Sequence, residues 1–569
     1  MSNSVKPAQI YDLIVVGSGA AGMAAALTAK IGGMDVAVFE KDSFFGGSTA
    51  VSGGAIWVPN NPLMRAAGME DDSEAAFEYL SGEIGNLIDT DLVHAFIDTG
   101  PEMVSFFQDN TELKFEYRAF SPDYHPDRPG AAMGGRVLDA ETFDGRRLGA
   151  EFARLKPPIN DFTLFGGMML NRFDIGHFMN MTRKPASALH AAGLLARQAR
   201  DRLSHPRGTR LTLGQAVAGR MALSALQRGI PIFTNMALEK LLTEGDTVTG
   251  IETADGTKIM ARRAVVLATG GFPANAKLRK EVMPHVARGA PHHSMSPKPA
   301  TGSAIIAAQN VGAHFITTNR NAAFWAPVSL IPEKDGGSRP FPHLFLDRAK
   351  PGVIAISPKG ARFVNEATSY HDFVSAMNEA ELSEAWLICD HMALRRYGLG
   401  PVRPSPAPYR QHLRSGYLKK ASTPSELAAF ISVPEKAMLE TINRFNIDAS
   451  NGTDLEFGKG STAYQTYLGD PDNKPNPCLR PLDKPPYYAV RIHPGDIGTS
   501  MGLAVDAHAR VLRQDRSVIT GLYACGNDMN SIMAGTYPGA GITLGPALTF
   551  GYIAGRHISN CPVLASRVR

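Results

Sequence analysis

The sequence predicts an α/β fold in which a parallel sheet covered by helices is assembled from distant parts of the chain. The apolar segment 11–16 leads into a glycine-rich turn and a helical run, and a second apolar segment, 35–39, follows. Strand, turn, helix and strand in this order are typical of parallel sheets. Comparable strand-and-turn segments return at 234–242, 264–271 and 521–528. The sequence between these segments is therefore expected to form a second, inserted domain.

Composition places the chain among globular proteins and excludes several functions. Its 569 residues suffice for two to four domains, and 44% of them are hydrophobic. The 58 basic and 54 acidic residues leave a net charge of +4, which excludes a generally basic nucleic-acid binder. The histidines show no metal-ligand spacing, so no metal site is expected. Four cysteines without a Cys-x-x-Cys pair exclude a disulfide scaffold and indicate a reducing, cytoplasmic compartment: Cys389, Cys478, Cys525 and Cys561.

Neither a targeting segment nor a membrane-spanning segment is expected. Residues 1–10 carry one lysine and no apolar run, unlike a signal peptide. No stretch of about 18 uncharged apolar residues occurs. The most apolar late segment, 542–555, is too short to span a bilayer and is interrupted by Gly545, Pro546 and Gly551.

The first glycine-rich turn has the spacing of a dinucleotide-binding motif. Gly17 allows a tight turn, Gly19 lets the backbone approach a pyrophosphate, and Gly22 lets the helix pack closely on the sheet. The free N–H groups at the start of the helix, at Ala20 and Ala21, can bind phosphates. A strand before this turn and a helix after it make the motif specific for a dinucleotide.

An acidic residue and a second loop then distinguish between dinucleotides. Glu40 lies 18 positions after Gly22, where a carboxylate can bind ribose hydroxyls. Lys41 follows, and then a loop rich in glycine and hydroxyl residues, 46–54. These loops resemble FAD enzymes of the fumarate reductase and succinate dehydrogenase flavoprotein superfamily. The resemblance implies a discontinuous Rossmann-like FAD-binding domain with an inserted α+β catalytic domain, or cap. Because the loop has no histidine, FAD is expected to be noncovalent.

The same resemblance implies the residues that contact FAD. Besides the first turn, Glu40 and Lys41, the second loop would pass the ribityl chain with Gly47, Ser48, Thr49, Ser52, Gly53 and Gly54. The adenine would meet the backbone of Ala237, and the ribityl or phosphate region would face Asp528. The remaining expected contacts are Thr269, Gly270, Gly526, Asn527, Gly541, Ile542 and Leu544. The neighbouring Cys525 is expected to be a packing residue.

A motif near the C-terminus narrows the family. The run Tyr537-Pro538-Gly539-Ala540-Gly541, together with 495–506, closely resembles the 3-ketosteroid Δ1-dehydrogenases. The resemblance covers most of the chain and is weakest at 150–215 and 400–480. It implies 1,2-desaturation of ring A of 3-keto-4-ene steroids, with electrons passing to a quinone or similar acceptor.

The resemblance also implies catalytic roles. Tyr537 and the N–H of Gly541 would bind the C3 carbonyl oxygen, where negative charge develops. Tyr370 would remove the C2 proton, and the flavin would take the C1 hydrogen as hydride. Because free tyrosine has a pKa of about 10, a second phenol is expected to assist. Tyr124 is favoured for this role over Tyr117.

Other functions remain open at this point. Fumarate reductases carry an arginine at the position of Tyr370, four residues after Glu366 of the segment Arg362-Phe-Val-Asn-Glu366, so reduction of an unsaturated acid is disfavoured. A 3-ketosteroid Δ4-(5α)-dehydrogenase and a flavin relay protein without a substrate of its own are further alternatives. His125 and His371 are interpreted as loop histidines rather than bases.

The domain boundaries follow from the flavin segments. Residues 1–320 and 493–569 are expected to form the FAD-binding domain, and 321–492 the catalytic domain. An extra insertion is expected at 151–215. It pairs the apolar segment 162–170 with a helix at 187–203, and its basic residues are Arg197, Arg200, Arg202, Arg207 and Arg210. Residues 160–210 could rest on an anionic membrane surface, although packing on the protein's own surface is favoured.

Overall fold

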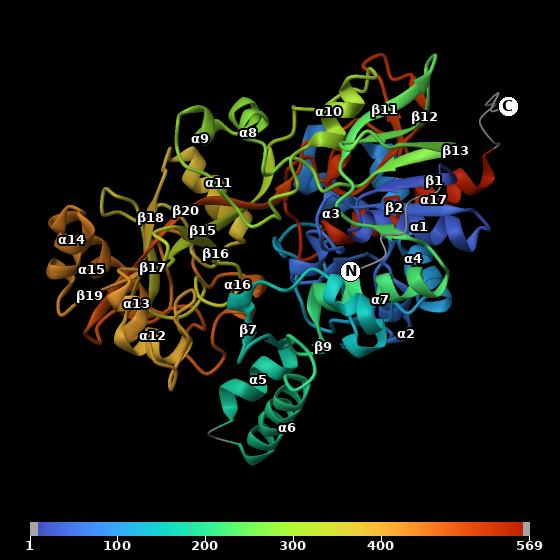
Figure 1. Cartoon of the computed structure of the whole chain (residues 1–569). Helices are drawn as coiled ribbons and strands as arrows, with labels where there is room; N and C mark the ends of the chain where they lie inside the picture. The colour runs from blue at the N-terminus through green and yellow to red at the C-terminus, as the bar shows by residue number, and fades with distance from the viewer. Residues whose placement is uncertain (1–8, 182–183, 562–569) are drawn as a thin grey trace.

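The protein is built on two large sheets (Figure 1), and the second includes β14 (His293–Ser294) from the range predicted for the first domain. The computed structural model describes residues 9–181 and 184–561. Both parts mix helices and strands, and the predicted α/β fold with an inserted domain is confirmed. Strand β20 (Tyr487–Thr499) runs through the predicted boundary at residue 492 and pairs within the second sheet over its length, so its residues beyond 492 belong to that sheet as well.

The first sheet combines the segments that the sequence placed far apart. Its central strands β2, β1, β13 and β22 are parallel neighbours, and Leu13, Ile14 and Val15 of β1 are fully buried. Burial on both faces explains their continuous apolar sequence. The strands are β1 (Ile10–Val16), β2 (Val36–Phe39), β10 (Ile232–Phe233), β11 (Leu238–Glu244), β12 (Thr247–Thr253), β13 (Lys258–Leu267), β21 (Arg510–Leu512) and β22 (Val518–Ala524).

The second sheet is the framework of the cap. Strand β20 lies at its centre and pairs with β14, β15, β18 and β19. The other strands are β14 (His293–Ser294), β15 (Ala323–Pro332), β16 (Ser338–Pro342), β17 (Val353–Ile356), β18 (Ala385–Asp390) and β19 (Leu418–Ala421). A separate apolar cluster, including Trp386 and Phe445, packs this sheet against α14 (Pro424–Ile431) and α15 (Glu435–Asn451).

Three small sheets and the remaining helices complete the structure. One small sheet contains β3 (Ile56–Trp57), β5 (Val137–Ala140) and β4 (Phe115–Tyr117). A second pairs β6 (Phe143–Asp144) with β9 (Arg210–Leu211), and a third pairs β7 (Thr163–Leu164) with β8 (Met168–Met169). The helices are α1 (Ala20–Ile31), α2 (Pro62–Ala66), α3 (Ser73–Ile84), α4 (Thr90–Asn110), α5 (Arg172–Asn180), α6 (Pro185–Asp201), α7 (Leu213–Gln227), α8 (Ala276–Val282), α9 (Pro284–Ala287), α10 (Ser303–Gln309), α11 (Tyr370–Glu379), α12 (His391–Tyr397), α13 (Arg410–Arg414), α16 (Ala463–Leu468) and α17 (Leu544–Asn560). Five short 3-10 turns are η1 (Thr49–Val51), η2 (Gly85–Leu87), η3 (Gly145–Arg154), η4 (Asn160–Phe162) and η5 (Gly526–Asp528).

The apolar late segment is a core helix. Helix α17 packs along α1, and its Gly551 lies so close that a Cβ there would stand 2.4 Å from the Ala21 carbonyl oxygen. Gly555 makes the same close approach to Ala25. Small residues therefore bring these two helices together beneath the first turn. None of the helices in the described part of the chain is both long and apolar enough to cross a bilayer.

The predicted insertion contains an antiparallel pair of helices, α5 and α6, which projects from the body of the molecule (Figure 1). Helix α6 starts and ends two residues before the expected range. Three of the five predicted arginines have internal partners. Arg210 pairs with Asp174 at 2.8 Å, Arg207 binds the Gln215 side chain, and Arg197 approaches Asp144 and Asp201.

Candidate active site

The first glycine turn has the strained geometry that only glycine accepts. Gly17 has a φ of +108°, and a Cβ there would lie 2.1 Å from the Ala268 carbonyl oxygen on the neighbouring strand end. A Cβ at Gly22 would lie 2.1 Å from the Gly17 carbonyl oxygen. Gly19 precedes α1, and no side chain comes within 3.5 Å of its Cβ position. The turn thus exposes backbone to a ligand at the start of α1.

Glu40 and the second loop close around the same point. The Glu40 carboxylate accepts hydrogen bonds from the Ser18 amide at 3.1 Å and the Ser18 hydroxyl at 2.6 Å. Thr49 accepts from the Ala20 amide at 2.9 Å, so its hydroxyl covers the first turn of α1. Lys41 donates to Thr301 at 2.8 Å. Glu40 and Thr49 therefore meet the turn at the N-terminus of α1, and Lys41 links the same segment to a residue 260 positions away.

Several other predicted cofactor residues lie next to this turn or in the loops beside it. Gly270 faces Ser48, whose hydroxyl would lie 3.8 Å from a Cβ at that glycine, and Gly526 faces Ala21. Around Gly53 the Cβ position has nothing within 4 Å, which leaves room for a ligand. The Met236 amide donates to the Glu40 carbonyl oxygen, which places the next residue, Ala237, beside Glu40. Ser52 donates to the Thr49 carbonyl oxygen and accepts from the Gly54 amide.

Asp528 differs from its expected role. Its carboxylate is fully buried and accepts from the Thr269 amide and hydroxyl and the Gly271 amide, so it does not face a ribityl or phosphate group. Burial raises the pKa of Asp528 above its usual range. Its contribution to the site is to hold the 269–271 turn in place. Cys525 beside it is buried, and burial raises the pKa of its thiol, as expected for a packing residue.

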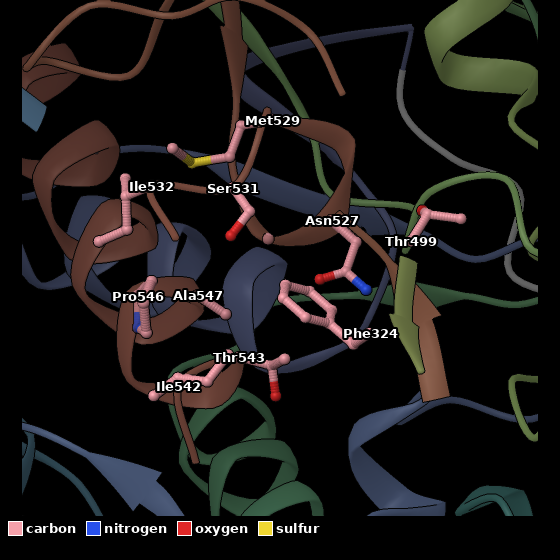
Figure 2. Close-up of a pocket in the computed structure, with 11 residues that line it drawn as sticks. Phe324, Thr499, Asn527, Met529, Ser531, Ile532, Ile542, Thr543, Pro546 and Ala547 are labelled. Atoms are coloured by element: carbon pink, nitrogen blue, oxygen red, sulfur yellow. The ribbon is translucent and has the colours of Figure 1, made fainter. Parts of the chain in front are cut away.

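A pocket joins the cofactor residues to the predicted catalytic tyrosines. In Figure 2 the Phe324 ring lies between Asn527 and Thr543. Phe324 also contacts the Tyr537 ring edge-on, with 5.6 Å between centroids, so the pocket borders Tyr537. The pocket is lined by Phe324, Thr499, Gly526, Asn527, Met529, Ser531, Ile532, Ile542, Thr543, Pro546 and Ala547.

Three phenols from distant segments converge beside this pocket. Tyr124 lies in the loop between β4 and β5, Tyr370 is the first residue of α11, and Tyr537 precedes α17. Each is at most 4% exposed. The Tyr124 hydroxyl donates to the Tyr370 hydroxyl at 3.2 Å. The three ring centroids lie 5.1–5.8 Å apart. Tyr117 is 37% exposed on β4 and lies outside this cluster.

Gly541 and its neighbours anchor the third phenol. Gly541 has a φ of +97°, and a Cβ there would lie 2.6 Å from the Ile56 amide nitrogen. Its carbonyl oxygen accepts from the Trp57 amide at 3.1 Å. The Pro538 carbonyl oxygen accepts from the Tyr124 amide at 2.8 Å and from the Tyr79 hydroxyl at 2.6 Å. The motif therefore carries the backbone link that joins Tyr537 to the Tyr124 segment.

Burial sets the protonation of these phenols. It raises the pKa of Tyr537 to about 12 and places the pKa of Tyr124 and Tyr370 well above 10, with the neighbouring tyrosines adding to both. All three are neutral at rest and can donate hydrogen bonds. The buried guanidinium of Arg348 stands in the field of Tyr124 and Tyr370 and donates to the Glu366 and Thr368 carbonyl oxygens. Motif reasoning missed this cation, because it lies in an unremarkable stretch of sequence.

The two histidines next to these tyrosines differ in local structure and in charge. His371 lies in helix α11 and not in the predicted loop, because the helix is capped by Ser369 and begins at Tyr370. Its Nδ1 accepts from the Trp325 amide, and burial lowers its pKa to about 4. His125 is in a loop as predicted. Despite its burial, bonds to Asp372 and Glu83 raise the pKa of His125 to about 10.

Comparison with known proteins identifies the family. The family model described as FAD binding domain matches residues 12–544. The chain belongs to this FAD-binding flavoprotein family. The flavoprotein is 39% identical over 558 residues to 4-oxocyclohex-2-ene-1-carboxylate 5-dehydrogenase of Sinomonas cyclohexanicum. The aligned region covers 96% of this chain and 93% of that protein. It is 36% identical over 571 residues to 3-oxosteroid 1-dehydrogenase of Mycobacterium tuberculosis, with coverage of 97% and 99%.

A solved structure supports the same family at the level of the fold. The crystal structure of 3-ketosteroid Δ1-dehydrogenase from Sterolibacterium denitrificans, in complex with 1,4-androstadiene-3,17-dione, superposes with a TM-score of 0.90 at 37% identity. It covers 97% of this chain and 100% of that chain. The resemblance inferred from the Tyr537–Gly541 motif is thereby confirmed. FAD is the flavoprotein's cofactor, and the glycine turn, Glu40 and the open space at Gly53 fit it.

Proposed function

We propose that the protein is an FAD-dependent 3-ketosteroid Δ1-dehydrogenase, which introduces a 1,2 double bond into ring A. One observation carries this proposal. Tyr124, Tyr370 and Tyr537 form a buried cluster beside the cofactor pocket, with Gly541 four residues after the last of them. The catalytic arginine of fumarate reductases has no counterpart at its expected position, because Tyr370 stands there.

Tyr537 and Gly541 would bind the C3 carbonyl oxygen. Loss of a proton beside a ketone builds negative charge on this oxygen, and a neutral phenol and a backbone N–H stabilise that charge. The raised pKa of Tyr537, about 12, keeps its proton available for this bond. The positive φ of Gly541, and the Ile56 amide nitrogen 2.6 Å from its Cβ position, explain why glycine is needed at this point of the motif.

Tyr370 would take the C2 proton. Its hydroxyl accepts a hydrogen bond from Tyr124, which orients it. Burial and the neighbouring tyrosines raise the pKa of Tyr370, and the charge of Arg348 acts in the opposite direction, in favour of the phenolate. FAD, when bound, supplies the acceptor for the C1 hydride. The contacts expected to hold it are those of the glycine turn, Glu40, Lys41, the second loop and the C-terminal pocket. A quinone or similar acceptor would reoxidise the enzyme.

A single-ring oxo acid is the second candidate substrate. The relative that is 39% identical acts, by its name, on a 4-oxocyclohexene carboxylate at the carbon next to the ketone. The reaction at the ketone is the same as in ring A, so the tyrosine cluster serves both substrates. The two candidates differ only in what lies beyond the reacting ring.

The anaerobic reduction of the flavin tests this proposal. Purified holoenzyme is mixed with 4-androstene-3,17-dione in one experiment and with 4-oxocyclohex-2-ene-1-carboxylate in another. Bleaching of the flavin's visible absorption by either ketone supports a dehydrogenase of this type. The absence of bleaching with both, and with other cyclic 3-ketones, would contradict it.

His125 is expected to position Tyr124 against Tyr370. Its ring links Glu83 of α3 at 2.8 Å to Asp372 of α11 at 2.9 Å, and so joins the segments that carry the two phenols. Replacing His125 by glutamine should lower kcat roughly 10-fold, since small misplacements of reacting groups are costly. The same change at the exposed His508 should leave kcat unaltered.

The pH dependence of stability tests whether His125 acts as a charged bridge. Because the pKa of His125 is raised to about 10, its stabilising effect is complete below the ordinary histidine pKa of about 6.5 and is lost as the pH rises through 10. The difference in Tm between wild type and H125Q should therefore be largest near pH 6 and disappear near pH 10. A difference that does not change with pH would exclude a charged bridge.

We also propose peripheral membrane contact through the α5–α6 hairpin at about 160–210. Phe165, Leu189 and Leu203 are 66%, 77% and 88% exposed there, and Arg200 and Arg202 have no internal partner among the described residues. Sedimentation with vesicles that contain phosphatidylglycerol should pellet wild type more than a variant with serine at these three apolar positions. Equal pelleting would reject the contact. A cytoplasmic location stays a prediction from the cysteines.

A further inference from the structure

One tryptophan bonds to both halves of the proposed catalytic machinery. Trp57 is the last residue of β3 and is fully buried. Its backbone amide donates to the Gly541 carbonyl oxygen at 3.1 Å, and its indole Nε1 donates to Asp123 Oδ1 at 2.8 Å. Asp123 directly precedes Tyr124, the partner of Tyr370. Trp57 therefore joins the loop that carries the proposed oxyanion donor to the segment that carries the assisting phenol.

The C-terminal motif packs directly on the bond between Trp57 and Asp123. A Cβ at Gly539 would lie 3.0 Å from the Trp57 Nε1 and 3.2 Å from the Asp123 Oδ1. The amide of the next residue, Tyr124, donates to the Pro538 carbonyl oxygen at 2.8 Å. The distance between the motif and the Tyr124 segment is thus set by direct contact, with the indole as one of the contacting groups.

The other bonds of Asp123 stay within its own loop, residues 118–136. Its Oδ2 accepts from Arg136 Nη1 and from the Ala132 amide, both at 2.9 Å. These bonds hold the loop together as a unit but do not tie it to the motif. The Trp57 indole supplies that connection, and its ring is fixed in turn by stacking on Phe96 with 6.1 Å between centroids.

The buried carboxylate of Asp123 gives the loop a defined position at a cost to stability. Burial raises the pKa of Asp123, although the charge of Arg136 opposes this shift. An apolar side chain could fill such a place without the desolvation of a charge. What the carboxylate adds is a set of directed hydrogen bonds, which specify one arrangement of the loop.

We propose that Trp57 is a positioning residue for the proposed dehydrogenation. Its indole N–H, through Asp123, sets the position of Tyr124 relative to Gly541. Tyr370, which is bonded to Tyr124, is thereby placed relative to the oxyanion donor. The inference rests on the proposed function, because that function assigns the roles of these groups. A displacement of about 1 Å at reacting groups can lower a rate about 100-fold, so the loss of this bond should be visible in turnover.

The test removes the indole N–H and measures flavin reduction by ketone. Trp57→Phe keeps an aromatic ring, and a second variant carries 3-benzothienylalanine at position 57, in which sulfur replaces the N–H and the ring shape is kept. Both should lower the rate constant of flavin reduction roughly 10- to 100-fold. Trp386→Phe is the matched control, because Trp386 is also buried but lies on β18 of the cap. Its rate constant should stay within twofold of wild type.

Combination with Tyr124→Phe separates positioning from general destabilisation. If Trp57 acts through Tyr124, the loss caused by W57F should shrink to about threefold or less in the Y124F background, because both changes act on one unit. The same fold-loss in both backgrounds would overturn the proposal, and so would a W57F rate constant within twofold of wild type. If W57F does not fold, the sulfur variant decides by the same criteria.

Hydrogen exchange separates these outcomes from failure of the proposed function. Exchange at the Tyr124 amide, which bonds to the Pro538 carbonyl oxygen, is followed in the holoenzyme without substrate. It should be roughly 10-fold faster in the Trp57 variants than in wild type and W386F, because local opening becomes easier. If no ketone bleaches the wild-type flavin but this difference is found, the link between the two segments stands and the proposed reaction fails. If ketones bleach the flavin but exchange is unchanged in the Trp57 variants, the positioning role fails alone.

Discussion

Replacing Tyr370 by phenylalanine is expected to lower the rate constant of flavin reduction by roughly 100- to 10,000-fold, the usual contribution of a positioned general base. The ring remains, so its edge-on contacts with Phe345, Tyr124 and Tyr537 should persist, and only the proton acceptor is lost. FAD content and Tm should stay close to those of wild type. Stopped-flow absorption after anaerobic mixing with substrate measures the rate constant directly.

Tyr117→Phe is the matched control for this prediction. Tyr117 is also a phenol in the first half of the chain, but it is 37% exposed on β4 and lies outside the cluster. Its variant should reduce flavin at the wild-type rate. If Y370F keeps more than a tenth of the wild-type rate constant, Tyr370 is not the base. A flavin relay protein without its own substrate would show this result.

Replacing Tyr537 by phenylalanine should lower kcat by roughly 100- to 1,000-fold, as found when one donor to a developing oxyanion is removed. Unlike Y370F, this variant should also bind the ketone several-fold more weakly, because a phenol already donates to the carbonyl oxygen in the ground state. Binding is measured with the reduced enzyme, which cannot turn over. Unchanged binding and unchanged kcat would remove Tyr537 from the oxyanion site.

The measured pH profile of the Y537F rate adds a second criterion. Burial raises the pKa of Tyr537 to about 12, so its donor proton is present throughout the range in which the protein is stable. The ratio of wild-type to Y537F rates should therefore stay constant between pH 6 and 9. If the ratio decreases between pH 6 and 9, Tyr537 loses its proton in that range and acts as a base instead.

Much of the cofactor site could be predicted because its signals are local. Gly17 and Gly22 are needed within one turn, where a Cβ would lie 2.1 Å from a backbone oxygen. Asp528 shows the limit of this reasoning. The sequence places it at the end of a flavin strand, but only the packing of β22 against β13 reveals that its carboxylate holds the 269–271 turn. His371 is a similar case, since the cap at Ser369 makes it helical and buried.

By itself, the sequence determined the α/β class, the dinucleotide turn and the motif around Tyr537, because each depends on spacing within a few residues. Only the tertiary structure brings Tyr124, and not Tyr117, against Tyr370, since the two partners are 246 residues apart in the sequence. It also revealed Arg348 and the His125 bridge. These groups acquire their properties from burial and from the charges packed around them. Both depend on residues that are distant in the sequence, so local sequence patterns do not indicate them.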